Sequence, residues 1–341
     1  PQSYHQINDI IIKIEKNKNI INATEFDVIE KFDTLNHVKN SNNQVSSFLT
    51  IQEGCDKFCK FCVVPYTRGP EFSRSVEELM IETKQLVNNG SKEIILLGQN
   101  VNAYNYKGKK LSDLILEIAK IKELKRIRYT TSHPRDFTDD LILAHKNCEK
   151  LMPLIHLPVQ SGSNKILDKM NRKHTVEAYL KTIEKLKRQD SKIEFSSDFI
   201  IGYPGETEVD FEKTLDLMKK VRYINSYSFI FSARPGTPSF NLKKLDNNLV
   251  KKRLFIFQNI AKKIKTEYRK SLLLKTVPVL FENKTKNENK YFGRDKFFNS
   301  IIVKSHENLT GKIKTVQITK VSQNTLYGEI KSKFSQKEFA A

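Results

Sequence analysis

The chain of 341 residues has no long apolar run and only four cysteines. A membrane-spanning helix needs about 18 consecutive apolar residues, and no stretch comes near that length. No secretory signal pattern opens the sequence as it is printed. Three of the four cysteines lie in one short stretch, which argues against a disulfide framework and favours a reducing compartment. We therefore expect a cytoplasmic protein with no membrane partner, long enough for two or three domains.

Acidic residues are scarce relative to basic ones. The chain holds 39 Asp and Glu against 59 Lys and Arg, a formal net charge of +20. A genome bias toward Lys, Asn and Ile would explain part of this charge. The charge is not evenly spread, however, because residues 243–275 hold eleven Lys and Arg but only Asp246 and Glu267 as acids. Such a concentration attracts polyanions and favours a nucleic acid as the partner.

The three clustered cysteines are Cys55, Cys59 and Cys62, in a C-x3-C-x2-C pattern. Thiolates are the usual ligands of iron–sulfur clusters, and three of them leave one iron of a four-iron cluster open to another ligand. A structural zinc site would need a fourth Cys or His ligand. The loop contains no His, and the remaining cysteine, Cys148, is distant in sequence. Zinc, and chance clustering of buried thiols, are therefore the weaker interpretations.

From Val45 the sequence alternates short apolar strands with amphipathic helices. Strands are predicted at 47–51, 93–97, 126–131, 154–159, 193–201 and 227–231. Helices are predicted after the N-cap Ser75, at 111–121, 139–146, around Ile166, at 178–188 and at 209–221. Right-handed crossovers curl such units toward a barrel, and six are too few to close it. The fold class is therefore α/β, a partial (βα)6 barrel. A doubly wound sheet is the alternative, but no glycine-rich dinucleotide turn follows the first strand.

Different patterns flank this barrel, which we place at 45–240. Residues 1–40 are mostly polar, with Ile7, Ile10, Ile11 and Ile14 at helical spacing or a short strand at 10–14. Residues 40–44 read as a linker, and 241–275 as a basic helical connector. A small antiparallel β-barrel is predicted at 276–331, with strands at 277–281, 291–292, 299–303, 312–319 and 325–330.

Small and polar residues follow the predicted barrel strands, where function gathers in such folds. They are Gly98, Gln99, Asn100, Ser132, His133, Gln160, Ser161, Gly202 and Arg234. Each of these residues, taken singly, could be an ordinary turn residue. Together, and beside a cysteine loop, they indicate the open end of a barrel that binds a polar cofactor. Asp198 within a strand is either a ligand for a ribose hydroxyl or a structural acid paired with a neighbour. Arg172 is either a carboxylate or phosphate ligand or a solvated helix-end residue.

Several motifs resemble the tRNA methylthiotransferases of the radical S-adenosylmethionine (SAM) superfamily. They span residues 54–69, 97–101, 132–134, 158–163 and 233–238, and the likeness extends from about residue 1 to 331. The final small barrel resembles the TRAM domain of that family, which binds tRNA. The N-terminal 40 residues resemble the tail of the family's N-terminal methylthiotransferase domain.

The resemblance implies both cofactors and chemistry. A [4Fe-4S] cluster on the catalytic ligands Cys55, Cys59 and Cys62 would cleave SAM to a 5'-deoxyadenosyl radical. A methylthio group would then be placed on carbon 2 of an N6-prenylated adenosine beside the anticodon of tRNA. The SAM contacts would be Gly98, Gln99, Asn100, Gln160, Ser161, Arg172 and Asp198. The partners would be the anticodon stem-loop and a reducing electron donor, and we expect a monomer.

The sequence departs from this family at its N-terminus. Members hold a second [4Fe-4S] cluster on three cysteines of the N-terminal domain, whereas no cysteine precedes Cys55 here. We therefore expect the chain as printed to cleave SAM without forming the methylthio product. Other members of the family act on threonylcarbamoyl-adenosine in tRNA or on a ribosomal protein, and these substrates stay open. A non-catalytic tRNA-binding protein built on a decayed enzyme is the alternative of another class.

Overall fold

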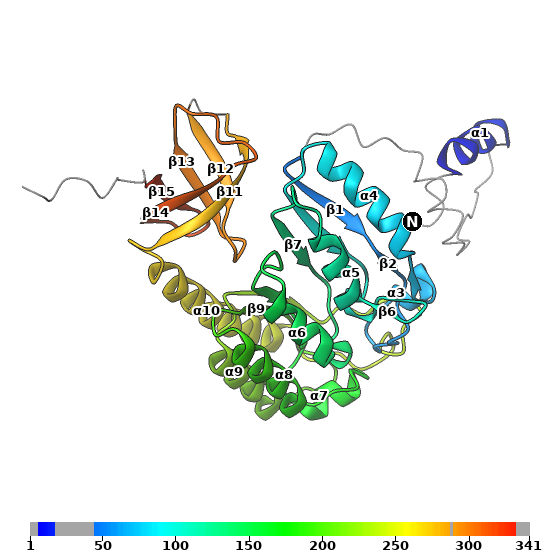
Figure 1. The fold of residues 1–341 in the computed structure, drawn as a ribbon. Helices are drawn as coiled ribbons and strands as arrows, with labels where there is room; N and C mark the ends of the chain where they lie inside the picture. The colour runs from blue at the N-terminus through cyan, green and yellow to red at the C-terminus, as the bar shows by residue number, and fades with distance from the viewer. Residues whose placement is uncertain (1–5, 18–43, 287–288, 332–341) are drawn as a thin grey trace, which may run out of the picture.

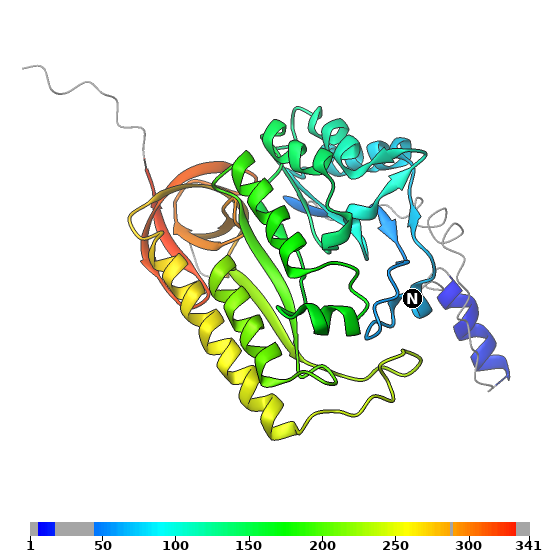
Figure 2. The same cartoon turned by 90° about the horizontal axis from the view of Figure 1, so that it is seen from below.

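The computed structural model describes residues 6–17, 44–286 and 289–331. Six parallel strands form two three-stranded sheets. Their order is β1 (Ser46–Thr50), β4 (Glu93–Leu97) and β7 (Arg126–Tyr129) in one sheet, and β8 (Leu154–His156), β9 (Glu194–Ile201) and β10 (Asn225–Ile230) in the other. One parallel bridge, Ile127 to Leu151, links the two sheets. Within the described residues β1 and β10 are not paired, so the strands form an open arc (Figure 2). This confirms the partial α/β barrel.

The predicted helices cover the outer face of the arc (Figure 1). They are α4 (Val76–Asn88), α5 (Leu111–Ala119), α6 (Asp139–Asn147), α7 (Asn164–Lys169), α8 (Val176–Gln189) and α9 (Glu208–Val221). Ser75 caps α4 as predicted, since its hydroxyl accepts a hydrogen bond from the Glu78 backbone N–H at 3.2 Å. Shorter elements lie between them: β2 (Gln52–Glu53), α3 (Val64–Arg68), β3 (Phe72–Ser73), η2 (Val101–Ala103), β5 (Asn105–Tyr106), β6 (Lys109–Lys110) and η3 (Pro134–Asp136).

Side chains alternate between the two faces of the strands. Ile127 and Tyr129 of β7, and Phe195 and Phe199 of β9, belong to the buried apolar core shared with the helices. Because successive residues of a strand face opposite ways, Arg126, Arg128 and Asp198 lie on the inner face of the arc. The inner face therefore carries polar groups, whereas the outer face supplies most of the packing energy.

Helix α10 (Asn247–Lys270) connects the partial barrel to the small one (Figure 1). It begins at its N-cap Asp246, whose carboxylate accepts a hydrogen bond from the Leu249 N–H at 2.9 Å. It packs on β10 and α9 and buries Val250 and Phe257 in the main core. The basic connector is thus a single long helix, one face of which packs against the partial barrel.

The small domain is a closed five-stranded barrel with its own apolar core. Its strands are β11 (Thr276–Lys284), β12 (Lys290–Arg294), β13 (Ser300–Lys304), β14 (Ile313–Val321) and β15 (Leu326–Ile330), in the order β11-β12-β13-β15-β14. The expectation of a wholly antiparallel barrel was wrong in one pair, because β13 and β15 run parallel. Strand directions cannot alternate all the way around a closed ring with an odd number of strands. At least one parallel pair is therefore required.

Two arginines of β7 join the two barrels. Arg126 donates to the carbonyls of Arg294, Asp295 and Pro278 at 2.7, 3.2 and 3.0 Å. Arg128 donates to the carbonyls of Lys296 and Asp295 at 2.9 and 2.8 Å, and to the Glu93 carboxylate at 2.8 Å. Because both guanidinium groups are buried, the loop after β12 is fixed against the inner face of the arc.

At the N-terminus, α1 (Ile7–Asn17) is a helix, so the alternative of a strand at 10–14 was wrong. The predicted linker at 40–44 falls almost entirely outside the described residues, as does most of the predicted domain tail at 1–40. None of the helices in the described ranges has the length and apolarity that crossing a bilayer requires.

Candidate cluster and SAM site

The cysteine loop follows β2 and lies at the carboxyl ends of the barrel strands. Its backbone is tied down on two sides, since the Cys55 N–H donates to the Gly69 carbonyl at 3.2 Å and the Lys60 N–H to the Met170 carbonyl at 3.0 Å. A turn inside the loop joins the Cys62 N–H to the Cys59 carbonyl at 2.9 Å. Gly54 precedes the loop with φ +74°, where a Cβ would collide with the Pro70 carbonyl. The loop conformation is thus held by contacts outside it.

The three thiols are partly withdrawn from water. Burial, together with smaller contributions from the Glu71 carboxylate and the two other thiols, raises the pKa of Cys55 to about 12. Burial also raises the pKa of Cys62, against an opposing effect of the Arg172 guanidinium. Without a metal, Cys55 and Cys62 are therefore protonated at neutral pH, and iron binding would displace their protons.

The donor set fits a four-iron cluster. In the described part of the chain, no three or more His, Cys, Asp or Glu side chains converge as ligands of one metal ion would. A four-iron cube needs a different arrangement, because each thiolate binds its own iron. Cys148 is buried at the end of α6, in contact with the main core, and takes no part in the loop.

Buried polar atoms near the loop lack a partner. They are Asn100 Oδ1, Ser132 Oγ, His133 Nε2, Arg172 Nε and His174 Nε2. Buried polar groups in folded proteins nearly always have hydrogen-bond partners. Five such atoms, from the ends of two strands and the segment after α7, therefore indicate a polar ligand that would satisfy them. Ser132 was among the strand-end residues predicted from the sequence. His174 was not, because no motif singles it out.

Arg172 lies against the cluster loop. Its Nη1 atom is 3.4 Å from Cys59 Sγ, and its Nη2 atom donates to the Pro158 carbonyl at 2.6 Å. The residue is 5% exposed, so the alternative of a solvated helix-end arginine was wrong. The buried guanidinium thus contacts a predicted cluster ligand and supplies a donor for an anionic group of a bound molecule.

Two neutral imidazoles stand beside this guanidinium. The rings of His133 and His174 are 5.7 Å apart. Burial and the Arg172 charge lower the pKa of His174 to about 4 and hold that of His133 far below its ordinary value. His133 Nδ1 accepts a hydrogen bond from the Arg135 N–H at 3.2 Å. Both rings therefore remain neutral at physiological pH.

A charged network holds the opposite side of the loop. Lys57 Nζ lies 2.9 Å from Asp136 and 3.4 Å from Glu71. The Asn100 amide donates to the same two carboxylates, at 2.7 and 3.2 Å. Asn100 is thus fixed by its amide nitrogen, and its unpartnered oxygen is left for a ligand.

Two of the predicted SAM contacts, Gln99 and Gly98, help to hold the loop. Gln99 Oε1 accepts from the Gly54 N–H at 2.7 Å. Gly98 leaves room for the side chain of Gln52, because a Cβ there would lie 2.6 Å from Gln52 Oε1. Gln52, fully buried, donates to the Gly54 carbonyl and accepts from the Asn100 N–H. Sequence reasoning missed Gln52, which carries no motif signal of its own.

The remaining predicted residues lie farther along the arc. Gln160 adopts φ +78° and pairs through its backbone with β9. Ser161 is 1% exposed and accepts from the Ser163 N–H at 3.2 Å, so its hydroxyl is engaged within the fold. Asp198 is partly exposed on the inner face, 3.5 Å from His156 Nε2. Gly202 packs against Val250, where a Cβ would clash. Arg234 is exposed.

Comparison with known proteins defines the class. Residues 49–218 match the Radical SAM superfamily, and residues 270–331 match the TRAM domain. Among solved structures, coproporphyrinogen III oxidase from Escherichia coli, titled a radical SAM enzyme, has a TM-score of 0.50 at 11% identity. The match covers 84% of this chain and 75% of that one, and it concerns the fold alone. The protein is thus a radical SAM enzyme with a C-terminal TRAM domain.

Curated relatives narrow the family. The chain is 56% identical to the tRNA-2-methylthio-N(6)-dimethylallyladenosine synthase of Pelagibacter ubique, over 97% of this chain and 75% of that protein. It is 51% identical to the synthase of the same name from a Wolbachia of Brugia malayi, over 96% and 76%. The chain therefore belongs to the family of tRNA-2-methylthio-N(6)-dimethylallyladenosine synthases. Radical SAM enzymes use a [4Fe-4S] cluster and SAM, so the two predicted cofactors are confirmed at the level of the family.

Proposed function

We propose that this protein takes part in placing a methylthio group on carbon 2 of an N6-prenylated adenosine beside the anticodon of tRNA. The observation that carries the proposal is the three-cysteine loop surrounded by unpartnered buried polar atoms, in a chain 56% identical to a synthase named for this product. The TRAM domain and the basic α10 favour RNA over a ribosomal protein as the substrate.

Cys55, Cys59 and Cys62 would hold the [4Fe-4S] cluster. When bound, the reduced cluster supplies the electron that cleaves SAM, and the resulting radical activates the substrate carbon. Arg172 would stabilise the Cys59 thiolate through its 3.4 Å contact and offer its free Nε to a carboxylate. The fixed amide of Asn100 would offer its Oδ1 atom to an amino group.

The other predicted SAM residues would act more indirectly. Gly98 and Gln99 would shape and hold the loop, as their contacts with Gln52 and Gly54 suggest. Gln160 and Ser161 would shape the wall of the site. Asp198 would be the ligand for a hydroxyl group, since its carboxylate is accessible on the inner face.

We further propose the domain division made from the sequence. Residues 1–40 would be the tail of the methylthiotransferase domain, 45–240 the radical SAM barrel, 241–275 the connector and 276–331 the tRNA-binding barrel. Cys148 alone cannot hold a second cluster. The second [4Fe-4S] cluster, as the sulfur source, would then be bound by residues outside this sequence. We expect a cytoplasmic monomer that receives electrons from a separate reducing partner.

Mass spectrometry of tRNA nucleosides tests this proposal. In a strain that lacks the gene, 2-methylthio-N6-dimethylallyladenosine should disappear and its precursor without the methylthio group should accumulate. A plasmid copy with Cys148→Ala should restore the product, whereas the matched copy with Cys55→Ala should not. Retention of the methylthio nucleoside in the deletion strain would contradict the proposal. Loss of a methylthiolated threonylcarbamoyl-adenosine instead would reassign the substrate.

A further inference from the structure

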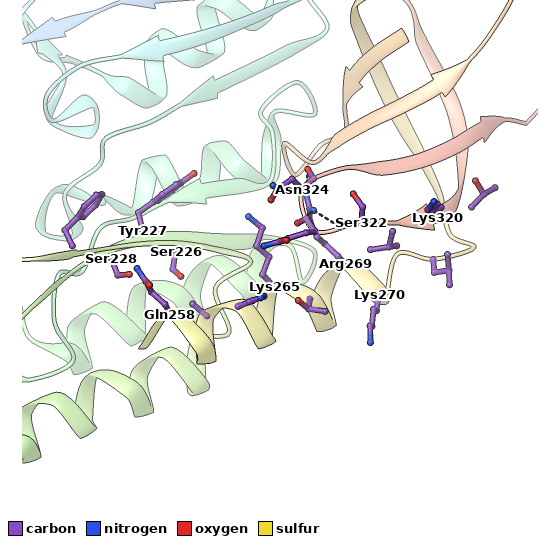
Figure 3. A pocket seen from close by; sticks show the side chains of 18 residues that line it. Ser226, Tyr227, Ser228, Gln258, Lys265, Arg269, Lys270, Lys320, Ser322 and Asn324 are labelled. Atoms are coloured by element: carbon purple, nitrogen blue, oxygen red, sulfur yellow. Dashed lines mark hydrogen bonds between the residues drawn. The ribbon is translucent and has the colours of Figure 1, made fainter. Parts of the chain in front are cut away.

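A large groove lies between α10, the edge strand β10 and the turn that joins β14 to β15 (Figure 3). Its volume is about 1120 Å³. The described residues that line it include five cations and no carboxylate. The cations are Lys262, Lys265, Arg269, Lys270 and Lys320. A concave surface with charge of one sign selects an anionic chain rather than a mixed protein surface.

Arg269 is built into the junction of helix and turn. Its Nη1 atom donates to the Ser322 and Gln323 carbonyls at 3.1 and 2.5 Å, and its Nη2 atom donates to the Asn324 carbonyl at 3.0 Å. The residue is 5% exposed, and its buried Nε has no partner. Burial and the Arg269 charge lower the pKa of the neighbouring Lys265. The groove therefore has a positive potential that a bound anion would relieve.

At its other end the groove reaches two exposed aromatic residues of β10. Tyr227 and Phe229 are 54% and 59% exposed, and they pair in register with Asp198 and Ile200 of β9. They share the inner face of the arc, where the Tyr227 ring lies 6.1 Å from that of His156. Ile200 packs against the same small apolar cluster as Phe61 of the cysteine loop. The groove thus leads from the TRAM domain to the wall of the cofactor site.

We propose that this groove holds the single-stranded RNA that flanks the target adenosine, with Tyr227 and Phe229 contacting the prenylated base. This deepens the proposed function and rests on it. Binding sites for single-stranded nucleic acid typically combine a basic groove with aromatic side chains, because phosphates pair with the cations and bases stack on the rings. The two rings suit a neutral dimethylallyl group. The carboxylate of a threonylcarbamoyl group would instead meet the carboxylate of Asp198.

Binding of RNA to the full chain tests the basic part of the groove. The probe is an anticodon stem-loop RNA that carries N6-dimethylallyladenosine, titrated at several salt concentrations. Replacing Lys262 by alanine should weaken binding about fivefold at 0.1 M salt and reduce the salt slope by about 0.7, as expected for one lost phosphate contact. Lys263→Ala is the matched control, because this adjacent, exposed lysine of α10 does not line the groove.

The same assay tests the aromatic end with a second RNA that carries plain adenosine. Phe229→Ala should abolish most of the preference for the prenylated RNA while leaving the salt slope unchanged. Phe255→Ala is the control, since Phe255 is 66% exposed on α10 but does not line the groove. Circular dichroism would verify that each variant is folded.

Equal effects of Lys262→Ala and Lys263→Ala, or an unchanged preference in Phe229→Ala, would overturn the inference. These outcomes are separable from failure of the proposed function. If the groove variants behave as expected and the deletion strain keeps its methylthio nucleoside, then the groove binds RNA but the assigned reaction is wrong. If the nucleoside is lost and the groove variants bind normally, then the reaction stands and the RNA lies elsewhere.

Discussion

Replacing Arg128 by methionine removes a charge that links three parts of the fold. The guanidinium pairs with the Glu93 carboxylate at 2.8 Å, and the two side chains are 7% and 1% exposed. It also donates to the carbonyls of Lys296 and Asp295 in the TRAM domain. In the variant, Glu93 keeps a hydrogen bond from the Ser46 hydroxyl and the charge of Arg126 nearby, but it loses its ion-pair partner. Breaking a buried ion pair costs about 3–5 kcal/mol, a large share of the about 5–15 kcal/mol that stabilises a typical domain.

Chemical denaturation and hydrogen exchange would measure this effect. We expect the free energy of unfolding to fall by about 3–5 kcal/mol and the amides of Phe297 and Asn299, which now donate to Asp295 Oδ1, to exchange faster. Lys185→Met is the matched control. It breaks a pair with Asp139 whose side chains are 42% and 75% exposed, and such pairs contribute about 1 kcal/mol or less.

A double variant separates the charge from the contact. Adding Glu93→Leu to Arg128→Met removes both members of the buried pair, so much of the lost stability should return, although the Lys296 carbonyl stays without its donor. If Arg128→Met alone costs less than about 1 kcal/mol and leaves exchange at 297–299 unchanged, the two barrels are not held together by this arginine.

Three further perturbations have defined outcomes. Cys59→Ser should reduce iron and sulfide to background after anaerobic reconstitution, whereas Cys148→Ser, buried away from the loop, should retain them. Gly98→Ala should cost about 1–3 kcal/mol and lower the cluster content, because its Cβ would lie 2.6 Å from Gln52 Oε1; unchanged melting and iron content would refute this. Burial lowers the pKa of His145 from its ordinary 6.5 to about 3. Between these two pH values the imidazole is therefore protonated in the unfolded chain but neutral in the folded chain. His145 should therefore contribute a loss of about 1.4 kcal/mol of stability per pH unit as the pH drops from 6.5 toward 3, beside the contributions of His133 and His174, and His145→Gln should reduce the slope by that amount in denaturation curves.

The parts of the fold that the sequence predicted are those with a local cause. The strand–helix alternation repeats within short windows, so all six strands of the arc lie where the apolar runs predicted them, with differences only at their ends. The cap at Ser75 depends on residues three positions apart. The cysteine spacing likewise encodes its chemistry within eight residues, from Cys55 to Cys62.

The missed features depend on partners distant in sequence. Nothing local indicates that Arg126 would donate to the carbonyl of Arg294, 168 positions away. The same holds for Gln52, whose amide joins the cysteine loop to Asn100 across 48 positions. Gln99 and Gly98 were correctly placed at a strand end, but only the fold shows that they hold the loop. A motif therefore predicted the place of the site, whereas tertiary contacts show which of its residues support the cysteine loop.

The same strands of the arc carry the contacts to the TRAM domain and the candidate site. Arg126 and Arg128 stand on β7 and fix the TRAM domain, while the carboxyl ends of the same strands carry the cysteine loop and the unpartnered polar atoms. A short strand rises about 3.3 Å per residue and bends little. The separation between the TRAM domain and the cysteines is therefore set by the sheet and by the buried hydrogen bonds of the two arginines, not by a free linker. A modifying enzyme needs such a fixed span, because a substrate held at one end must present one carbon atom at the other. The groove along α10 follows this span on the open side of the arc, where no further strand of the described residues pairs with β10.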